Sequence, residues 1–166
     1  MLEFTYENLE TCYKLALQQD YKVLSIDEYI NYRSKGAEVT DKIIVNRVDI
    51  DSSIKKAEKV RKLFDCLNVK ATFFVRLHAE EYNPFSFENY RILKKILESG
   101  HEIGYHNEVM DQSAIWKEDA SFCFKRDVDI LNKMLGIEIR GSAGHGGLTG
   151  FNNLDFWKEK KSTDFN

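Results

Sequence analysis

Asp49 and Asp51 follow an apolar run that begins at Ile43, and a single residue separates them. Residues two positions apart in a strand point to the same side of it. Neighbouring carboxylates disfavour joint ionisation, so a metal ion, a role as a base or a basic partner would explain the pair. If the strand persists through both residues, this chemistry is available at its carboxyl end. If the strand ends earlier, the two aspartates belong to a solvated turn or a helix cap.

Further polar residues end the later strands that the sequence predicts. They are Arg76 and His78 on the second strand, His106 with Asn107 and Glu108 on the third, and Arg140 on the fourth, with His145 in the next loop. The carboxyl ends of parallel strands share one edge, where such folds place their chemistry. Carboxylates and imidazoles suit Zn²⁺ or a similar divalent ion, leaving one carboxylate as a base. The chemistry of such a site is amide or ester hydrolysis.

For two of these residues, the sequence allows two interpretations. Arg140 either pairs with a surface acid or holds and tunes the base. His145 is flanked by glycines, which either let the backbone approach a ligand closely or form an ordinary flexible turn. In the loop after the second strand, we expect Tyr82, Asn83 and Phe85 to contact a substrate, with packing of the loop against the core as the alternative.

The elements that must position these residues alternate along the chain. A leading helical segment, with helices over residues 6–19 and from residue 26, precedes a polar loop over residues 33–41. Apolar runs and helical spacing then predict strands at 43–51, 69–77, 101–106 and 137–141, helices at 52–67, 87–97 and 116–135, and a helical start at 153–160. The run from Ile43 to Val45 is typical of a strand that is covered on both faces.

Alternating strands and helices predict a parallel sheet with right-handed crossovers. No G-x-G-x-x-G follows the first strand, which argues against a dinucleotide fold. A full barrel takes about 200 residues or more. The 166 residues therefore predict an α/β fold that is a distorted or incomplete (β/α) barrel with parallel strands. We expect a single domain over 1–166, with β/α units from residue 42 and the last units missing.

The composition of the chain limits the kinds of molecule that it is expected to bind. The chain is 43% hydrophobic, and its 24 basic and 27 acidic residues are mixed along it, so no basic stripe predicts nucleic-acid binding. No run is long enough to span a bilayer and no leader precedes the first helix, so we expect a soluble, cytoplasmic protein. Cys12, Cys66 and Cys123 occupy apolar helical positions without metal-ligand spacing and predict buried, reduced thiols.

Several segments together resemble the polysaccharide deacetylase family, the carbohydrate esterases with a NodB-type distorted barrel. They are VDIDSSIKKAEKV, VKATFFV with YNPFSFENYRILKKI, SGHEIGYHNE, and IRGSAGHGG with NNLDFW, and they extend over nearly the whole chain. The resemblance implies that Asp49 is the base, that Asp51 and His106 hold a divalent metal, and that Arg140 orients the base. Since D-x-D does not map directly onto the family's adjacent D-D pair, the roles of the two aspartates could be exchanged.

Two positions depart from the family pattern. Val48 stands where this variant has histidine, and Met110 stands where many members carry a second metal-binding histidine. The third ligand would then be His145. The resemblance implies a metal-dependent hydrolase that removes an acetyl group from a carbohydrate. The alternative is a catalytically inactive member that binds or scaffolds in glycan biosynthesis. An incomplete barrel has an open sheet edge, which gives such a chain reason to form a homo-oligomer.

Overall fold

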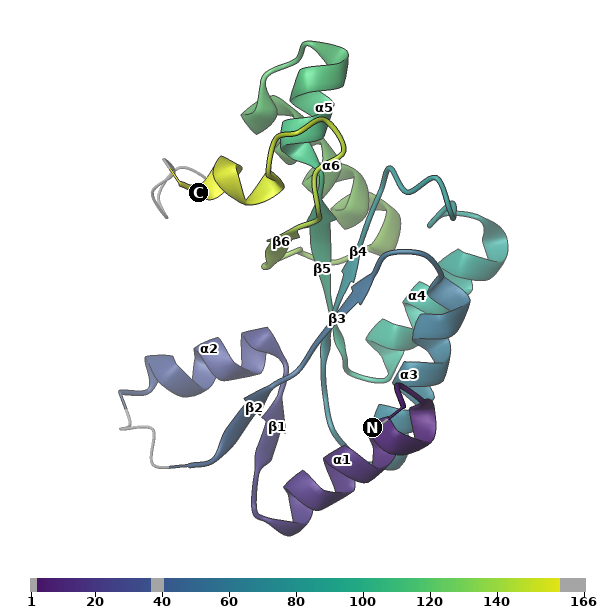
Figure 1. Cartoon of the computed structure of the whole chain (residues 1–166), viewed down its shortest axis with the longest axis vertical. Coiled ribbons are helices and arrows are strands. Elements are labelled where there is room, and N and C mark those ends of the chain that lie inside the picture. The colour runs from purple at the N-terminus through teal and green to yellow at the C-terminus, as the bar shows by residue number, and fades with distance from the viewer. Residues whose placement is uncertain (1–2, 37–40, 159–166) are drawn as a thin grey trace.

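The computed structural model describes residues 3–36 and 41–158, and these form a mixed α/β fold (Figure 1). Its main sheet has four parallel strands in the order β3-β4-β5-β6. They are β3 (Arg47–Ile50), β4 (Thr72–Val75), β5 (Glu102–Asn107) and β6 (Ser142–Gly144). The sheet is curled into a half-barrel. At this level the prediction of an incomplete α/β barrel with parallel strands is confirmed.

A second, two-stranded parallel sheet precedes the main one, formed by β1 (Lys22–Leu24) and β2 (Ile43–Val45). The predicted single strand over 43–51 is therefore wrong, because the chain changes sheets at Asn46. The Asn46 amide donates to the Leu24 carbonyl at 2.7 Å, while its own carbonyl accepts from the Thr72 amide at 3.0 Å. The expected burial of the apolar run is also wrong: Val45 is 40% exposed.

Helices cover the strands and have recognisable starts. They are α1 (Tyr6–Gln18), α2 (Ile26–Ser34), α3 (Ile54–Cys66), α4 (Phe87–Glu98), α5 (Val109–Trp116) and α6 (Ala120–Leu135), followed by the 3₁₀ helix η1 (Asn153–Trp157). Ser53 caps α3 by accepting a hydrogen bond from the Lys56 amide, which fixes where the chain turns after β3. Figure 1 shows α3 and α4 side by side along one flank of the sheet, while α5 packs against α6 beyond the end of β5.

The predicted helix over 116–135 is two helices. Lys117 adopts a left-handed conformation with φ of 60°, which ends α5, and Asp119 caps the start of α6. The polar passage before residue 112 is thus partly helical. The predicted helical start at 153–160 is the 3₁₀ turn up to Trp157, and residues 159–160 lie outside the described residues. The same holds for residues 37–40 of the predicted loop.

The predicted strand over 137–141 is also wrong. The strand is β6, which begins at Ser142 inside the glycine-rich stretch and pairs with Tyr105 to Asn107 of β5. The local sequence predicted a strand from the apolar residues before Gly141. In the structure, the residues that pair with β5 and form the strand are those after Gly141. This shift decides which end of the sheet Arg140 occupies.

The core lies between the sheet and the helices. Its largest fully buried side chains include Phe64, Phe73, Phe74, Leu93, Tyr105 and Leu131. Gly104 is required on β5, because a Cβ at this position would overlap the Phe74 ring. Cys123 is buried, but Cys12 and Cys66 are exposed, so the prediction of three buried thiols is wrong for two of them. No helix in the described part of the chain is long and apolar enough to cross a membrane.

Candidate metal centre

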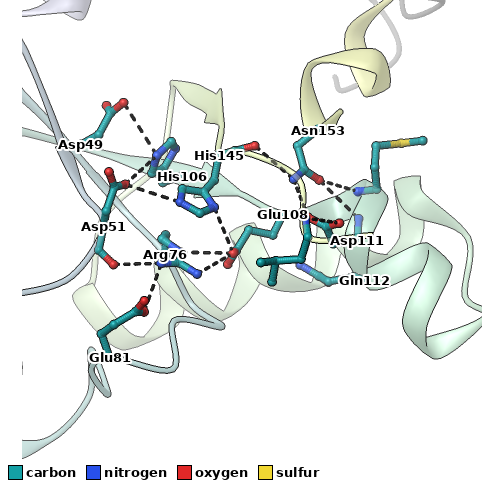
Figure 2. Close-up of polar contacts among 12 residues, drawn as sticks. Asp49, Asp51, Arg76, Glu81, His106, Glu108, Asp111, Gln112, His145 and Asn153 are labelled. Atoms are coloured by element: carbon teal, nitrogen blue, oxygen red, sulfur yellow. Dashed lines mark hydrogen bonds and ion pairs between the residues drawn. The ribbon is translucent and has the colours of Figure 1, made fainter. Parts of the chain in front are cut away.

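Three residues that the sequence placed at the carboxyl edge of the sheet meet there. Asp51 follows β3, His106 belongs to β5 and His145 follows β6, and one ligand atom from each lies within 4.8 Å of the others (Figure 2). The His106 Nε2 is 3.2 Å and the His145 Nε2 is 3.8 Å from the Asp51 Oδ1. This group could hold a metal ion.

The orientation of His106 suits a ligand. Its side chain is 3% exposed, and its Nδ1 lies 2.9 Å from the carbonyl oxygen of Ala143. Because a carbonyl can only accept, Nδ1 is the donor, and in the neutral ring Nε2 keeps its lone pair. That lone pair faces the aspartates. A histidine that donates its other nitrogen to a carbonyl in this way is typical of metal sites.

His145 is held by its backbone on one side and faces Glu108 on the other. Its amide donates to the Asn107 carbonyl at 2.9 Å, which continues the contact between β5 and β6. Its Nδ1 lies 3.3 Å from the Glu108 Oε1, but the contact lacks hydrogen-bond geometry and Nδ1 has no hydrogen-bond partner among the described residues. A metal on Nε2 fits this arrangement, since a small rotation would let Nδ1 donate to the carboxylate.

Arg76 donates hydrogen bonds to several residues that surround the three candidate ligands. This side chain is 5% exposed and donates to the Glu108 Oε1 from Nε at 3.1 Å and from Nη2 at 2.8 Å. Its Nη1 donates to the Asp51 carbonyl at 2.8 Å and to Glu81 at 3.2 Å. Burial alone would lower the pKa of Arg76, but the hydrogen bond and charge of Glu108 outweigh it and raise the pKa. A permanent cation thus joins the ends of β3 and β5.

Asp49 lies beside the three residues and is held by an arginine that the sequence reasoning missed. Its Oδ2 is 3.7 Å from the His106 Nε2. Arg47 donates to Oδ1 from Nε at 2.8 Å and to Oδ2 from Nη2 at 2.7 Å. The Arg47 guanidinium also lies 5.2 Å from the centre of the Phe74 ring. The signal available in the sequence was the spacing of two between Arg47 and Asp49, which places both on one side of a strand.

Arg140 is not where the sequence placed it. It precedes β6 instead of ending a strand, so it lies at the amino edge of the sheet near His101 and Glu102. Its Nη1 is 3.3 Å from Asp27, and its side chain is 61% exposed. The expected contact with Asp49 is therefore wrong, and the interpretation of Arg140 as a surface ion pair is the correct one.

The residues predicted to contact substrate have structural contacts of their own. The Tyr82 hydroxyl donates to the Ile50 carbonyl at 2.7 Å and accepts from the Arg76 amide at 3.0 Å, and burial raises its pKa. The Asn83 side-chain oxygen accepts from the Phe85 amide at 2.9 Å, while Phe85 packs against the core. These contacts account for the loop, and substrate binding by Tyr82, Asn83 and Phe85 stays a prediction.

A buried network holds the loop that carries His145. Asn153 is fully buried, and its Nδ2 donates to the Asp111 Oδ2 at 2.7 Å and to the His145 carbonyl at 3.1 Å (Figure 2). Asp111 in turn accepts from Leu148 and Thr149 in the same loop. Burial alone would raise the pKa of Asp111, but the hydrogen bonds from Thr149 and Asn153 lower it. The glycine-rich stretch is thus an anchored loop, not an ordinary flexible turn.

Comparisons of the chain with protein-family models and with curated proteins give no match. The similarity to polysaccharide deacetylases therefore rests on the motifs alone. The site geometry is the independent basis for a function.

Proposed function

We propose that this chain is a hydrolase with a NodB-like distorted barrel that uses a divalent metal to remove an acetyl group from a carbohydrate. The observation that carries the proposal is the meeting of Asp51, His106 and His145 within 4.8 Å beside a second carboxylate. One carboxylate oxygen and two imidazole nitrogens are a donor set of catalytic zinc sites, which keep a further position open. We therefore propose Zn²⁺ as the ion.

A zinc ion in this position would supply Lewis acidity toward the acetyl carbonyl and toward water. The two aspartates of the site have different proposed roles. Asp51 is the proposed ligand because it approaches both histidines, whereas Asp49 approaches only His106, and at 3.7 Å. Asp49 is the proposed base, held in position by Arg47.

The reaction balances as a hydrolysis. Water loses a proton to Asp49, and its oxygen forms a bond to the acetyl carbon. The bond from that carbon to the sugar nitrogen or oxygen breaks, and the leaving atom takes up a proton. The products are acetate and the free amine or alcohol.

A catalytically inactive, carbohydrate-binding protein is the second candidate. Both carboxylate oxygens of Asp49 accept hydrogen bonds from Arg47, so a water molecule must share these oxygens with the guanidinium. By the family resemblance, Val48 and Met110 also stand where members of the family carry histidines, and the histidine at the position of Met110 binds the metal. Under this proposal the site keeps its shape and its ion but does not turn over an acetylated sugar.

The test begins with metal content. The purified chain is stripped with a chelator, dialysed against Zn²⁺ and assayed by elemental analysis, together with the Asp51→Asn and His106→Gln variants. Asp129→Asn is the matched control: Asp129 and Asp51 have side chains that are 57% and 58% exposed, and Asp129 pairs only with Lys133 in the described structure. We expect one equivalent of metal in the parent and the control, and much less in the two site variants.

Acetate release then separates the two candidates. Chito-oligosaccharides present N-acetyl groups and acetylated xylan presents O-acetyl groups. Release by the metal-loaded chain that is lost in Asp49→Asn supports the hydrolase. Stoichiometric metal with no acetate from either substrate supports the inactive carbohydrate-binding protein. Absence of stoichiometric metal from the parent would overturn the hydrolase.

A further inference from the structure

Strand β3 forms one end of the main sheet, and its outer edge has no partner strand among the described residues. The other end of the sheet is covered, because η1 packs against β6 and a Cβ on Gly144 would lie 3.1 Å from the backbone of Asn153. An open strand edge is a template for pairing with another chain. In the described structure, the edge along β3 is therefore the end of the main sheet at which a further strand can pair.

Two residues of β3 direct their backbone groups to this edge. Alternate residues of a paired strand direct their N–H and C=O groups to opposite edges. The Asn46 carbonyl accepts from the Thr72 amide of β4 at 3.0 Å, so Asn46 and Val48 face β4. Arg47 and Asp49 then face the open edge, and each offers one donor and one acceptor to a new strand.

A groove of about 590 Å³ runs beside the same edge, between α1 and α3. Its lining includes Leu9 and Tyr13 on α1, Val48 on β3, and Val60 and Phe64 on α3. Side chains alternate along a strand, so Val48 lies on the groove side of β3 and its two charged neighbours lie on the opposite side. A second strand at this edge would place its own side chain next to Val48, in a largely apolar groove.

The charges along the edge are self-complementary. The side chains of Arg47 and Asp49 are 46% and 31% exposed. Homo-oligomers are most often twofold dimers, and a twofold axis perpendicular to a strand pairs it antiparallel with its copy. Centred on this part of β3, the backbone allows Arg47 opposite Arg47, Asp49 opposite Asp49, or Arg47 opposite Asp49. Like charges directly opposite one another destabilise a strand pair, so the last register is favoured.

We propose that the β3 edge pairs with the β3 edge of a second copy of this chain, antiparallel and centred on Val48. Arg47 and Asp49 of each copy exchange backbone hydrogen bonds with Asp49 and Arg47 of the other. The two Val48 side chains then lie next to each other in the combined grooves. The pairing does not depend on the proposed hydrolysis. At the candidate metal centre it places the guanidinium of the partner copy opposite Asp49, which already accepts from its own Arg47.

Sedimentation equilibrium of the full chain tests the pairing. A chelator is present, so that metal binding plays no part. We expect an equilibrium of monomer and dimer, with the dimer predominant at about 100 µM because the paired segment is short and the interface is small. A parent chain that is monomeric at this concentration would overturn the proposal. So would a larger assembly, because pairing about a twofold axis closes at two copies.

Charge reversal tests the register. Arg47→Asp gives an acidic edge and Asp49→Arg a basic one, so each variant alone opposes like charges and should associate about tenfold more weakly than the parent. Mixed in equal amounts, the two variants set acids opposite bases and should form a heterodimer. Lys133→Asp is the control, since it reverses one member of an exposed ion pair with Asp129 on α6 and should leave association unchanged. Unchanged association of either edge variant, or no heterodimer in the mixture, contradicts the proposal.

A cross-link tests the central contact without a change of charge, which keeps the proposal falsifiable if a reversed variant does not fold. Opposed residues between the hydrogen-bonded pairs of an antiparallel ladder have Cα atoms about 4.5 Å apart, within the range of a disulfide. Val48→Cys, in a Cys12→Ser and Cys66→Ser background that removes the exposed thiols, should form a disulfide between copies when diamide oxidises it.

Val45→Cys in the same background is the matched control. Val45 is 40% exposed, but the proposed register does not place it opposite Val45 of the other copy. Absence of the Val48→Cys cross-link, or equal cross-linking of Val45→Cys, would show that the copies do not pair in this way. Failure of the hydrolase proposal would appear in the metal and acetate assays and leave these measurements unaffected.

Discussion

Replacing Asn153 with alanine should release the loop that brings His145 to the metal centre. Asn153 is fully buried at the start of η1, and its side chain joins two segments. Its Oδ1 accepts from the Met110 amide at 2.9 Å at the start of α5. Its Nδ2 donates to Asp111 at 2.7 Å and to the His145 carbonyl at 3.1 Å. The alanine side chain makes none of these contacts.

The cost can be worked from these bonds. A neutral hydrogen bond contributes about 1 kcal/mol net, and one to a charged group about 1.5–3 kcal/mol. The contacts with Met110 and His145 are neutral and the contact with Asp111 is to a carboxylate, so we expect a loss of about 4 kcal/mol in the free energy of unfolding. Domains of this kind are stable by about 5–15 kcal/mol, so the loss is a large fraction.

Urea unfolding followed by circular dichroism measures this loss from the shift in midpoint at constant slope. Asn152→Ala is the matched control at the neighbouring position. Its side chain only caps η1 by accepting from the Leu154 amide at 2.9 Å, so we expect a cost of about 1 kcal/mol. Zn²⁺ titration under conditions where both variants are folded should show a weaker affinity in Asn153→Ala alone, because the ligating arrangement is populated for less of the time.

A third variant sharpens the test. Asn153→Asp keeps the size of the side chain and its acceptor but sets a carboxylate against Asp111, and it should destabilise the chain at pH 7 at least as much as alanine does. Asn153 does not anchor the loop if Asn153→Ala costs no more than Asn152→Ala, or if Asn153→Asp is as stable as the parent.

Three further outcomes are expected. If the hydrolase proposal holds, Arg47→Ala should lower acetate release at least tenfold by freeing Asp49, whereas Arg140→Ala should leave it within twofold; the opposite ranking would contradict the assignment of Arg47. The pKa of Asp127 is lowered from its ordinary value of 3.8, so its carboxylate stabilises the fold above that pH and the contribution is lost as the pH falls through the lowered value. Acid unfolding of Asp127→Asn should therefore depend less on pH below about 3.8 than that of the parent, and parallel curves would speak against this. Gly104→Ala would drive a Cβ into the Phe74 ring and should cost about 1–3 kcal/mol in thermal unfolding, and an unchanged midpoint would show that the ring can move.

Much of the candidate site was accessible from the sequence. Asp49, Asp51 and His106 were predicted at one edge of a parallel sheet, and the structure brings them together with His145. Two local signals sufficed: apolar runs that identify strands, and the rule that parallel strands expose their carboxyl ends at a common edge. Neither signal depends on which residues of two strands pair.

Pairing and long-range hydrogen bonds account for what the sequence could not predict. Arg140 was placed at the wrong edge because β6 begins at Ser142, and that start is set by its register with Tyr105 of β5. The break at Asn46 likewise depends on partners in two different sheets, Leu24 and Thr72.

Long-range contacts also determine which residues surround the site. Glu108 appeared in the sequence only as a polar residue after a strand, and Asn153 only as the start of a helical turn. In the folded chain Glu108 accepts hydrogen bonds from Arg76 and lies beside His145, and Asn153 anchors the loop of His145 to α5. Local patterns in the sequence were therefore enough to identify which residue types gather at the carboxyl edge, since strand periodicity is a local property. Only in the folded chain is it settled that Arg140 lies at the opposite edge of the sheet and that Asn153 positions His145, because the first depends on the register of β6 with β5 and the second on buried hydrogen bonds between distant residues, and no local pattern encodes either.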